Sequence, residues 1–289
     1  MSPLAREIAA TLGLQLTGEA ALPPGRTRSA LKLDTGAGAL FIKTVPAEHA
    51  DRLAAEADGL ALLRDSGSFR VPALAGTGVS GEVAWLALEW LALKPVSGDD
   101  DGRAFGQALA ALHAVRGEHY GLGRDNWLGD SPQENGWSAS WPLFYAQKRL
   151  QPALERLIAG GERGELIRTL RALVERVPAL FLDYRPVPSL LHGDLWHGNA
   201  GIADGRPAVF DPAVHYGDRE ADYAMTELFG GFPVSMYAAY QKAAPLDAGA
   251  PARRGLYRLH HLLNHFLLFG EAYRRETERT AARLLSELR

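Results

Sequence analysis

The alternation of apolar and polar positions predicts short strands near the N-terminus and helices in the rest of the chain. Residues 4–14 carry apolar side chains at helical spacing. Residues 31–33 and 40–43 are short apolar runs on either side of a glycine-bearing turn, which predicts a β-hairpin. Residues 50–63 are rich in alanine and leucine and favour a helix, and residues 83–88 form an apolar run of strand length. This order of hairpin, helix and strand predicts a small α+β lobe.

Helical periodicity dominates the chain after residue 100. Phe105, Leu109 and Leu112 fall at i, i+4 and i+7, and a second apolar stripe extends over residues 166–180. Both stripes are typical of helices that pack on a core. The polar, turn-rich segment 94–101 separates this region from the first and predicts a lobe boundary. We therefore divide the chain into residues 1–91 and residues 92–289.

Four further segments complete the predicted elements. Residues 125–137 are polar and aromatic with turn residues, which predicts a surface loop of the kind that often binds ligands. Residues 200–210 predict a second hairpin, and residues 217–228 predict a helix. An apolar helix is expected around residues 259–268.

Composition and charge narrow the class of protein. Of 289 residues, 47% are hydrophobic and 22% are charged, as in an ordinary globular protein. The formal net charge of −3 gives no electrostatic case for binding nucleic acid or an anionic membrane. The chain has no cysteine, which excludes disulfides and thiolate chemistry. No apolar run reaches the roughly 18 residues of a membrane span, so we expect a cytoplasmic protein. We also expect a monomer, although no sequence feature bears on the oligomeric state.

A short apolar run followed by a polar turn carries the candidate chemistry. The run ends in His192-Gly193-Asp194, and Asn199 follows Asp194 by five residues. Twelve residues beyond Asn199, Asp211 ends a second apolar run. Asp194 is placed to accept the proton of a hydroxyl, and Asn199 and Asp211 offer the hard oxygen ligands that Mg²⁺ prefers. Because the catalytic loops of protein kinases use the same spacing of Asp and Asn, the pattern favours phosphoryl transfer.

Two residues of the N-terminal stretch extend this constellation. Lys43, at the end of a predicted hairpin strand, is placed to reach the phosphates of a nucleotide, and Glu56 on the next helix is placed to pair with it. Each has a simpler interpretation, since a lysine at a strand end is usually solvated and Glu56 would be an exposed carboxylate. The combined order of Lys, Glu, apolar strand, helices, Asp, Asn and Asp is what favours a functional site.

Histidines are weaker candidates. In a turn of this kind His192 usually bonds to the backbone, and His197 is expected at the surface. His260, His261 and His265 lie on the predicted apolar helix, the last two at i, i+4 spacing. Because no carboxylate cluster accompanies them, the sequence does not favour a metal site there.

With these residues in view, the sequence resembles the fructosamine kinase (ketosamine 3-kinase) family of the protein-kinase-like superfamily, which is related to aminoglycoside phosphotransferases. The resemblance covers most of the chain. The motif Asp-x4-Asn by itself fits aminoglycoside or choline-type kinases equally well, whereas Leu195-Trp196 and Arg219-Glu220-Ala221-Asp222 favour fructosamine kinases. The segments that carry the resemblance are 192–199, 211–222 and 225–232, with further similarity at 125–135, 257–265 and 268–270.

The resemblance implies a bilobal α+β fold of the protein-kinase type. A small β-rich lobe with one main helix, residues 1–91, would bind nucleotide. A larger, mostly helical lobe, residues 92–289, would hold the catalytic and acceptor-binding groups. The implied activity is ATP-dependent phosphorylation of the sugar O3 of ketosamines, which are adducts of sugars with amines or proteins. Phosphorylation makes the adduct unstable, so this activity would repair glycation damage. The partner is then a small-molecule or protein-bound ketosamine.

The resemblance also implies roles for the candidate residues. Asp194 would be the base, Asn199 and Asp211 would hold Mg²⁺, and Lys43 with Glu56 would orient the phosphates of ATP. The backbone from Glu89 to Leu91 would form the hinge that offers hydrogen bonds to adenine. Asp222 would anchor the catalytic loop through backbone hydrogen bonds. 

Trp196 offers a flat platform for the apolar face of a sugar, and the competing interpretation is that it packs beneath the loop. Residues 23–29 depart from the family pattern, because they hold one glycine and two arginines, Arg26 and Arg28, where a glycine pair is usual. These arginines would pair with phosphate oxygens or face water.

Two alternatives stay open. A kinase for another hydroxylated amine, such as an aminoglycoside, would need an acidic acceptor site, and six acidic residues permit one: Asp99, Asp100, Asp101, Asp125, Asp130 and Glu134. A non-catalytic binding protein on a kinase scaffold is the other alternative. The intact set of Lys, Glu, Asp, Asn and Asp argues against it.

Overall fold

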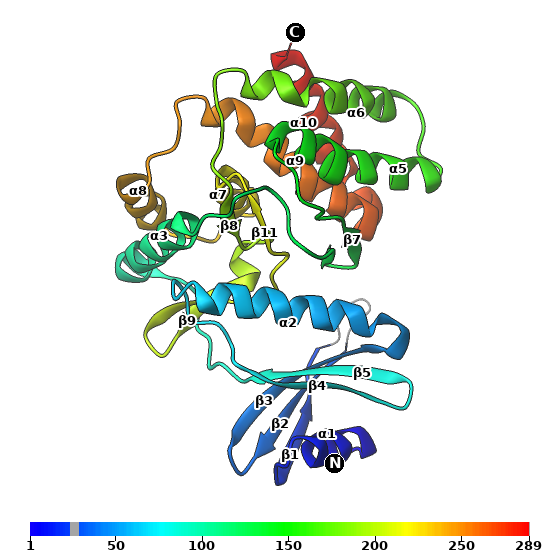
Figure 1. The fold of residues 1–289 in the computed structure, drawn as a ribbon, viewed down its shortest axis with the longest axis vertical. Helices are drawn as coiled ribbons and strands as arrows, with labels where there is room; N and C mark the ends of the chain where they lie inside the picture. Colours follow the sequence, from blue (N-terminus) through cyan, green and yellow to red (C-terminus); the bar gives the residue numbers. More distant parts are fainter. Residues whose placement is uncertain (24–28, 289) are drawn as a thin grey trace.

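The computed structural model describes residues 1–23 and 29–288 and consists of a β-sheet part followed by a larger helical part (Figure 1). The antiparallel sheet has the strand order β1-β2-β3-β5-β4. Its strands are β1 (Leu16–Ala21), β2 (Ser29–Thr35), β3 (Gly38–Pro46), β4 (Leu74–Ser80) and β5 (Val83–Glu89). The predicted α+β fold with a small β-rich part and a mostly helical part is confirmed. The predicted phosphate-covering loop falls largely on residues 24–28, which lie outside the described residues.

Helices cover both faces of the sheet, which explains the continuous apolar run of β5. The two helices are α1 (Pro3–Thr11) and α2 (Ala50–Asp65), on opposite sides of the sheet (Figure 1). Trp85 of β5 belongs to a buried cluster with Ile8 of α1, and the neighbouring Leu86 belongs to a cluster with Leu60 of α2. Because successive side chains of a strand point to opposite faces, a strand covered on both sides is apolar throughout.

Two helices end earlier than their apolar stripes predict. α1 stops at Thr11, and Gly13 follows in a left-handed conformation with φ of 66°. Glycine adopts this conformation without steric cost, so it ends the helix. The helix predicted for residues 166–180 is α6 (Glu165–Arg176) followed by a 3₁₀ turn, Val177–Phe181. Pro178 lacks the amide hydrogen that the next α-helical hydrogen bond would need.

The C-terminal part is built from helices that pack around two apolar clusters. Its remaining helices are α3 (Gly98–Ala114), α4 (Trp141–Tyr145), α5 (Gln151–Ala159), α7 (Glu220–Leu228), α8 (Val234–Ala243), α9 (Ala250–Phe269) and α10 (Arg274–Glu287). The stripe of Phe105, Leu109 and Leu112 on α3 is fully buried, as predicted. None of the helices in the described part of the chain is long and apolar enough to cross a membrane.

Three short strand pairs lie between the helices. They are β6 (Asn126–Leu128) with β7 (Ser131–Gln133), β8 (Ser189–Leu191) with β11 (His215–Gly217), and β9 (Ala200–Ala203) with β10 (Arg206–Val209). The pair β9–β10 is the hairpin predicted for residues 200–210. All three are antiparallel.

The segment predicted as a surface loop, residues 125–137, is partly buried instead. Its strands β6 and β7 bring the side chains of Asn126 and Gln133 to the interior, and Asn135, two residues after β7, is buried beside them. Asn126 Oδ1 accepts hydrogen bonds from Gln133 Nε2 and Asn135 Nδ2, each at 2.8 Å. Buried amides are tolerated when they bond to one another, so the polarity of the segment did not indicate exposure.

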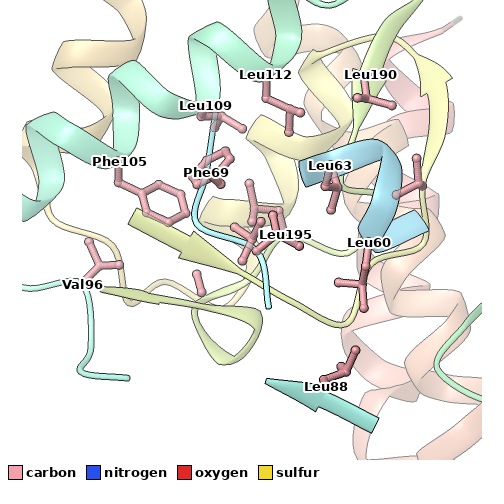
Figure 2. Packing of buried hydrophobic residues seen from close by; sticks show 14 of the residues in the cluster. Leu60, Leu63, Phe69, Leu88, Val96, Phe105, Leu109, Leu112, Leu190 and Leu195 are labelled. Carbon is pink, nitrogen blue, oxygen red and sulfur yellow. The ribbon is translucent and has the colours of Figure 1, made fainter. Parts of the chain in front are cut away.

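One apolar cluster connects the sheet part to the helical part. Leu60 and Leu63 of α2 belong to the same buried cluster as Leu112 of α3, Leu190 of β8 and Leu195 in the loop that follows (Figure 2). This shared core fixes α2 against the segment that carries the candidate chemistry.

Candidate functional site

The loop after β8 turns sharply at Gly193. Its φ is 83°, and a Cβ there would lie 2.1 Å from the carbonyl oxygen of Ala213, so only glycine fits. The carboxylate of Asp222 on α7 accepts hydrogen bonds from the amides of His192 at 2.7 Å and Gly193 at 2.8 Å. These are the backbone contacts predicted for Asp222.

The Asp222 carboxylate is buried and still ionised. Burial raises its pKa, but hydrogen bonds from His113 and from the Gly193 amide outweigh burial and bring the pKa below the ordinary value. His113 Nε2 lies 3.3 Å from Asp222 Oδ2, and its Nδ1 lies 2.8 Å from the hydroxyl of Tyr240. Asp222, which holds the loop, is therefore contacted by His113 of α3, and His113 is contacted by Tyr240 of α8.

His192 has the structural role expected of it. Its Nε2 lies 3.0 Å from the carbonyl oxygen of Phe210, and its Nδ1 accepts a hydrogen bond from the amide of Asp194 at 3.3 Å. Burial lowers its pKa, so the ring is neutral. His197, in the turn after it, is exposed as predicted.

Asn199 connects the loop of Asp194 to the backbone at Asp211. Its Nδ2 donates to the carbonyl oxygen of Asp194 at 3.0 Å, to Asp194 Oδ2 at 3.1 Å and to the carbonyl oxygen of Asp211 at 3.5 Å. Asp211 arrives at the end of the β9–β10 hairpin with φ of 56°, a conformation uncommon for residues other than glycine. The structure thus brings together three residues that the sequence placed on two separate segments.

Lys43 lies between two carboxylates, one from each part of the molecule. Its Nζ is 2.5 Å from Glu56 Oε1 and also forms an ion pair with Asp211 Oδ1. Lys43 lies within β3, which extends to Pro46, and is 4% exposed, so the expectation of a strand end was wrong. Glu56 is 9% exposed, which excludes the interpretation as a solvated helix carboxylate.

A polar cavity of about 400 Å³ opens beside Asp194. Residues from α2, the β6–β7 turn, the loop after β8 and α9 line it. They include Arg52, Glu56, Asn126, Trp127, Asp130, Asp194, Trp196, Asn199, Asp211, His265 and Phe269.

Trp196 lies at the cavity and also packs on its own loop. Its ring lines the polar cavity and makes an edge contact with Phe229, with 6.1 Å between ring centroids. A Cβ at Gly198 would lie 2.3 Å from the ring, so Trp196 also packs closely on its own loop. The indole is held in place by the loop while it faces the cavity.

An apolar cavity of about 360 Å³ lies on the other side of Asp211. Its lining combines the sheet with the segment that leaves it. The lining residues are Phe41, Pro72, Leu88, Glu89, Trp90, Leu91, Leu93, Phe210 and Asp211.

The predicted hinge contributes fewer hydrogen-bonding groups to this cavity than expected. The amide of Glu89 donates to the carbonyl oxygen of Ala73 at 2.8 Å, and its carboxylate pairs with Arg70. The amide of Trp90 donates to Ala39 at 3.1 Å. In contrast, the amide of Leu91 has no hydrogen bond within residues 1–23 and 29–288.

The histidines of α9 do not form a metal site. His260 and His261 are buried, and burial lowers the pKa of His261 to about 3, so its ring is neutral. His261 Nδ1 lies 3.9 Å from Asp194 Oδ1. Within the described part of the chain, no three His, Cys, Asp or Glu residues are grouped to hold a metal ion.

Arg52 lines the polar cavity and was not predicted from the sequence to belong to the site. It lies one helical turn before Glu56 on α2 and forms an ion pair with Asp130 from the β6–β7 turn. The i, i+4 spacing to Glu56 was a usable signal, because it places Arg52 on the same face of the helix.

Comparison with known proteins agrees with the resemblance seen in the sequence. The sequence model of the family described as "Fructosamine kinase" matches residues 3–287. A Synechocystis protein named "Probable ketoamine kinase" is 41% identical over 242 residues, which cover 82% of this chain and 80% of that protein.

Solved structures agree with the fold. A crystal structure of a Thermobifida fusca protein, provisionally named a fructosamine-3-kinase, has a TM-score of 0.88 at 33% identity and covers 98% of this chain and 99% of that one. The aminoglycoside phosphotransferase APH(4)-Ia, in ternary complex with AMP-PNP and hygromycin B, has a TM-score of 0.65 at 15% identity, with 99% of each chain covered. This second likeness concerns the protein-kinase-like fold alone. The family match over residues 3–287 and the identity to the Synechocystis protein show that the chain belongs to the fructosamine kinase family.

Proposed function

We propose that the protein is an ATP-dependent kinase that phosphorylates the sugar O3 of ketosamines. The observation that carries this proposal is the position of Asp211, which lines both the apolar and the polar cavity. The apolar cavity suits the base of a nucleotide and the polar cavity suits a hydroxylated acceptor. The phosphoryl group in transfer would then lie at their junction, beside Asp211 and Lys43.

The residues at the junction fit Mg²⁺. Asn199 donates through Nδ2, so its Oδ1 remains an acceptor, and Asp211 supplies carboxylate oxygens. Mg²⁺ prefers such hard oxygen ligands and completes its shell with water and phosphate oxygens. When bound there, it would neutralise the charge of the phosphates.

The remaining residues support an in-line transfer to a hydroxyl. The carboxylate of Asp194 would take the proton of the O3 hydroxyl as the oxygen bonds to the γ-phosphorus. The bond from the γ-phosphorus to the bridging oxygen breaks in the same step, and ADP leaves. Lys43, held by Glu56 at 2.5 Å, would present its charge to the phosphates. Leu91 would offer its amide to the edge of the base.

The polar cavity favours a sugar over a polycation as acceptor. Of the acidic residues that an aminoglycoside would require, Asp130 lines the cavity and is already paired with Arg52, whereas Asp99, Asp100 and Asp101 begin α3 and do not line it. The indole of Trp196 offers an apolar platform to a sugar ring. We infer that free or protein-bound ketosamines are the acceptors and that O3 phosphorylation serves their removal.

An acceptor screen tests the proposal. ATP consumption by the purified protein with Mg²⁺ is measured with fructosyl-lysine, ribulosyl-lysine, aminoglycosides, choline and simple sugars, and the position of the phosphate is read by NMR. We expect turnover with a ketosamine and phosphate on O3. Turnover of an aminoglycoside alone would overturn the acceptor assignment. Nucleotide binding without turnover of any acceptor would favour a non-catalytic binding protein.

A further inference from the structure

Helix α2 is tied to the acceptor side of the molecule by two ion pairs. Arg52 donates to the carbonyl oxygen of Gly129 at 3.1 Å and pairs with Asp130 Oδ1, both in the β6–β7 turn. On the next turns of the same helix, Asp58 pairs with Arg124, which precedes β6. Both pairs therefore join one helix of the sheet part to one segment of the helical part.

The two pairs differ in their surroundings. The side chains of Arg52 and Asp130 are 9% and 19% exposed, and both line the polar cavity. The side chains of Arg124 and Asp58 are 38% and 58% exposed and do not line it. An exposed ion pair contributes little because water and salt screen it, whereas a desolvated pair with an additional hydrogen bond fixes its partners firmly.

The less exposed pair, Arg52 with Asp130, is connected to the Lys43 side of the site through helix α2. Arg52 and Glu56 are four residues apart on α2, so their side chains lie on the same helical face. Glu56 contacts Lys43, and Lys43 contacts Asp211. Contacts thus extend from the β6–β7 turn to Arg52 and from Glu56 to Lys43, and the intervening turn of α2 joins Arg52 to Glu56.

We propose that Arg52 is a positioning residue, which holds α2 against the β6–β7 turn so that Glu56 keeps Lys43 oriented for the nucleotide. The inference rests on the proposed function, since it assigns the Lys43 side of the site to nucleotide phosphates. This role of Arg52 would couple the β6–β7 turn to nucleotide binding, because α2 would transmit a change at Asp130 to Lys43. A contribution to stability is a weak explanation for the Arg52–Asp130 pair, since apolar residues of similar volume stabilise a protein as well or better.

The experiment measures the dissociation constant of AMP-PNP in the presence of Mg²⁺ for the full chain and its variants. Arg52→Met keeps an unbranched apolar stem and removes the charged guanidinium group. We expect it to weaken AMP-PNP binding about tenfold, the size of coupling seen between residues in one network. Asp130→Asn, which keeps the volume of the partner, should give a similar loss. Arg124→Met is the matched control, with the same substitution on the exposed pair, and should change the constant by less than about twofold.

A double variant separates positioning through Glu56 from a direct effect. If Arg52 acts through Glu56, Arg52→Met combined with Glu56→Gln binds AMP-PNP about as weakly as Glu56→Gln alone. Additive losses, or equal effects of Arg52→Met and Arg124→Met, would overturn the inference. Thermal unfolding of each variant confirms that it is folded, and Asp130→Asn keeps the test available where Arg52→Met does not fold.

The readout needs no acceptor, so the inference and the proposed function can fail separately. An acceptor screen without ketosamine turnover, together with a non-additive binding cycle, would reject the proposed acceptor and retain Arg52 as the positioning residue. Ketosamine turnover together with additive losses of AMP-PNP binding would retain the proposed acceptor and reject Arg52 as the positioning residue.

Discussion

The two cavities that meet at Asp211 are built in different ways. The apolar cavity takes its shape from side chains of the sheet, such as Phe41 and Leu88, whose positions follow from strand register. The polar cavity lies between loops and the helices α2 and α9, and hydrogen bonds hold the loop that carries Asp194 in place. Asp194, for example, depends on Asn199 beside it and on Asp222 beneath its loop.

Because of this difference, we expect the two cavities to respond differently to amino-acid substitutions. A cavity of apolar side chains tolerates substitutions that keep its volume, because its energy comes from many small contacts. A cavity of polar groups depends on single hydrogen bonds, since a buried partner left unsatisfied costs about 1–3 kcal/mol. Substitutions of the hydrogen-bonded groups that form and hold the Asp194 loop should therefore have the larger effects, and they should affect chemistry and stability more than nucleotide binding.

The largest effect is expected for Asp194→Asn. The amide keeps the shape of the carboxylate but cannot take a proton, so turnover should fall by about a thousandfold. Binding of AMP-PNP should change little, because the apolar cavity is untouched. Steady-state turnover and AMP-PNP titration measure the two quantities, and a parallel loss of both would break the distinction between the cavities.

The second-largest effect is expected for Asp222, whose carboxylate holds the loop after β8. Asp222→Asn leaves one of the amides of His192 and Gly193 without an acceptor and should lower the free energy of unfolding by roughly 3 kcal/mol. The folded-state pKa of Asp222 is depressed, since hydrogen bonds outweigh the burial that raises it. Its contribution is thus present above the unfolded pKa of about 3.9 and is lost as the pH falls through the folded pKa.

Urea unfolding across the acidic range checks this prediction. The variant should show a weaker loss of stability below about pH 4 than the original protein. Equal slopes in the two proteins would show that Asp222 does not anchor the loop as an ionised group.

A smaller effect is expected in the apolar cavity. Phe41→Ala removes part of the surface available to a nucleotide base and should raise the AMP-PNP dissociation constant about tenfold, because roughly 1–2 kcal/mol of apolar contact is lost. Phe41→Leu is the control that keeps most of the apolar surface and should bind nearly as well. If Phe41→Ala slowed turnover without weakening AMP-PNP, the apolar cavity would not be the base site.

The smallest effect is expected at the rim of the polar cavity. Trp196→Leu removes the flat surface offered to a sugar and should raise the KM of a ketosamine about fivefold, with the KM of ATP unchanged. Trp196→Phe retains an aromatic face, so its KM for the ketosamine should lie between those of the original protein and Trp196→Leu. An unchanged KM for the ketosamine in Trp196→Leu would favour the interpretation that the indole only packs on its loop against Gly198.

Periodicity located several of the helices and strands, although α1 and α6 end earlier than predicted, and it failed where a polar segment is buried. The stripe of α3 agrees with the structure because one face of that helix is apolar. The hairpin at residues 200–210 agrees because Asp204 and Gly205 adopt the positive φ that its two-residue turn requires. Residues 125–137 disagree because Asn126 and Gln133 satisfy each other inside the protein. A polar segment can be predicted to be exposed only where its polar groups have water as their sole hydrogen-bond partner. Polar groups that bond to one another within the protein can be buried.

The order of chemical groups along the chain determined the candidate site, since Asp194, Asn199, Asp211, Lys43 and Glu56 were identified from residue type and spacing. Their mutual distances, the burial of Lys43 and the ion pair between Asp130 and Arg52 were decided only by the tertiary structure. The reason is physical: spacing along a helix or a turn constrains neighbours in sequence. Contacts between α2 and the β6–β7 turn depend instead on how two separate parts pack on one shared core.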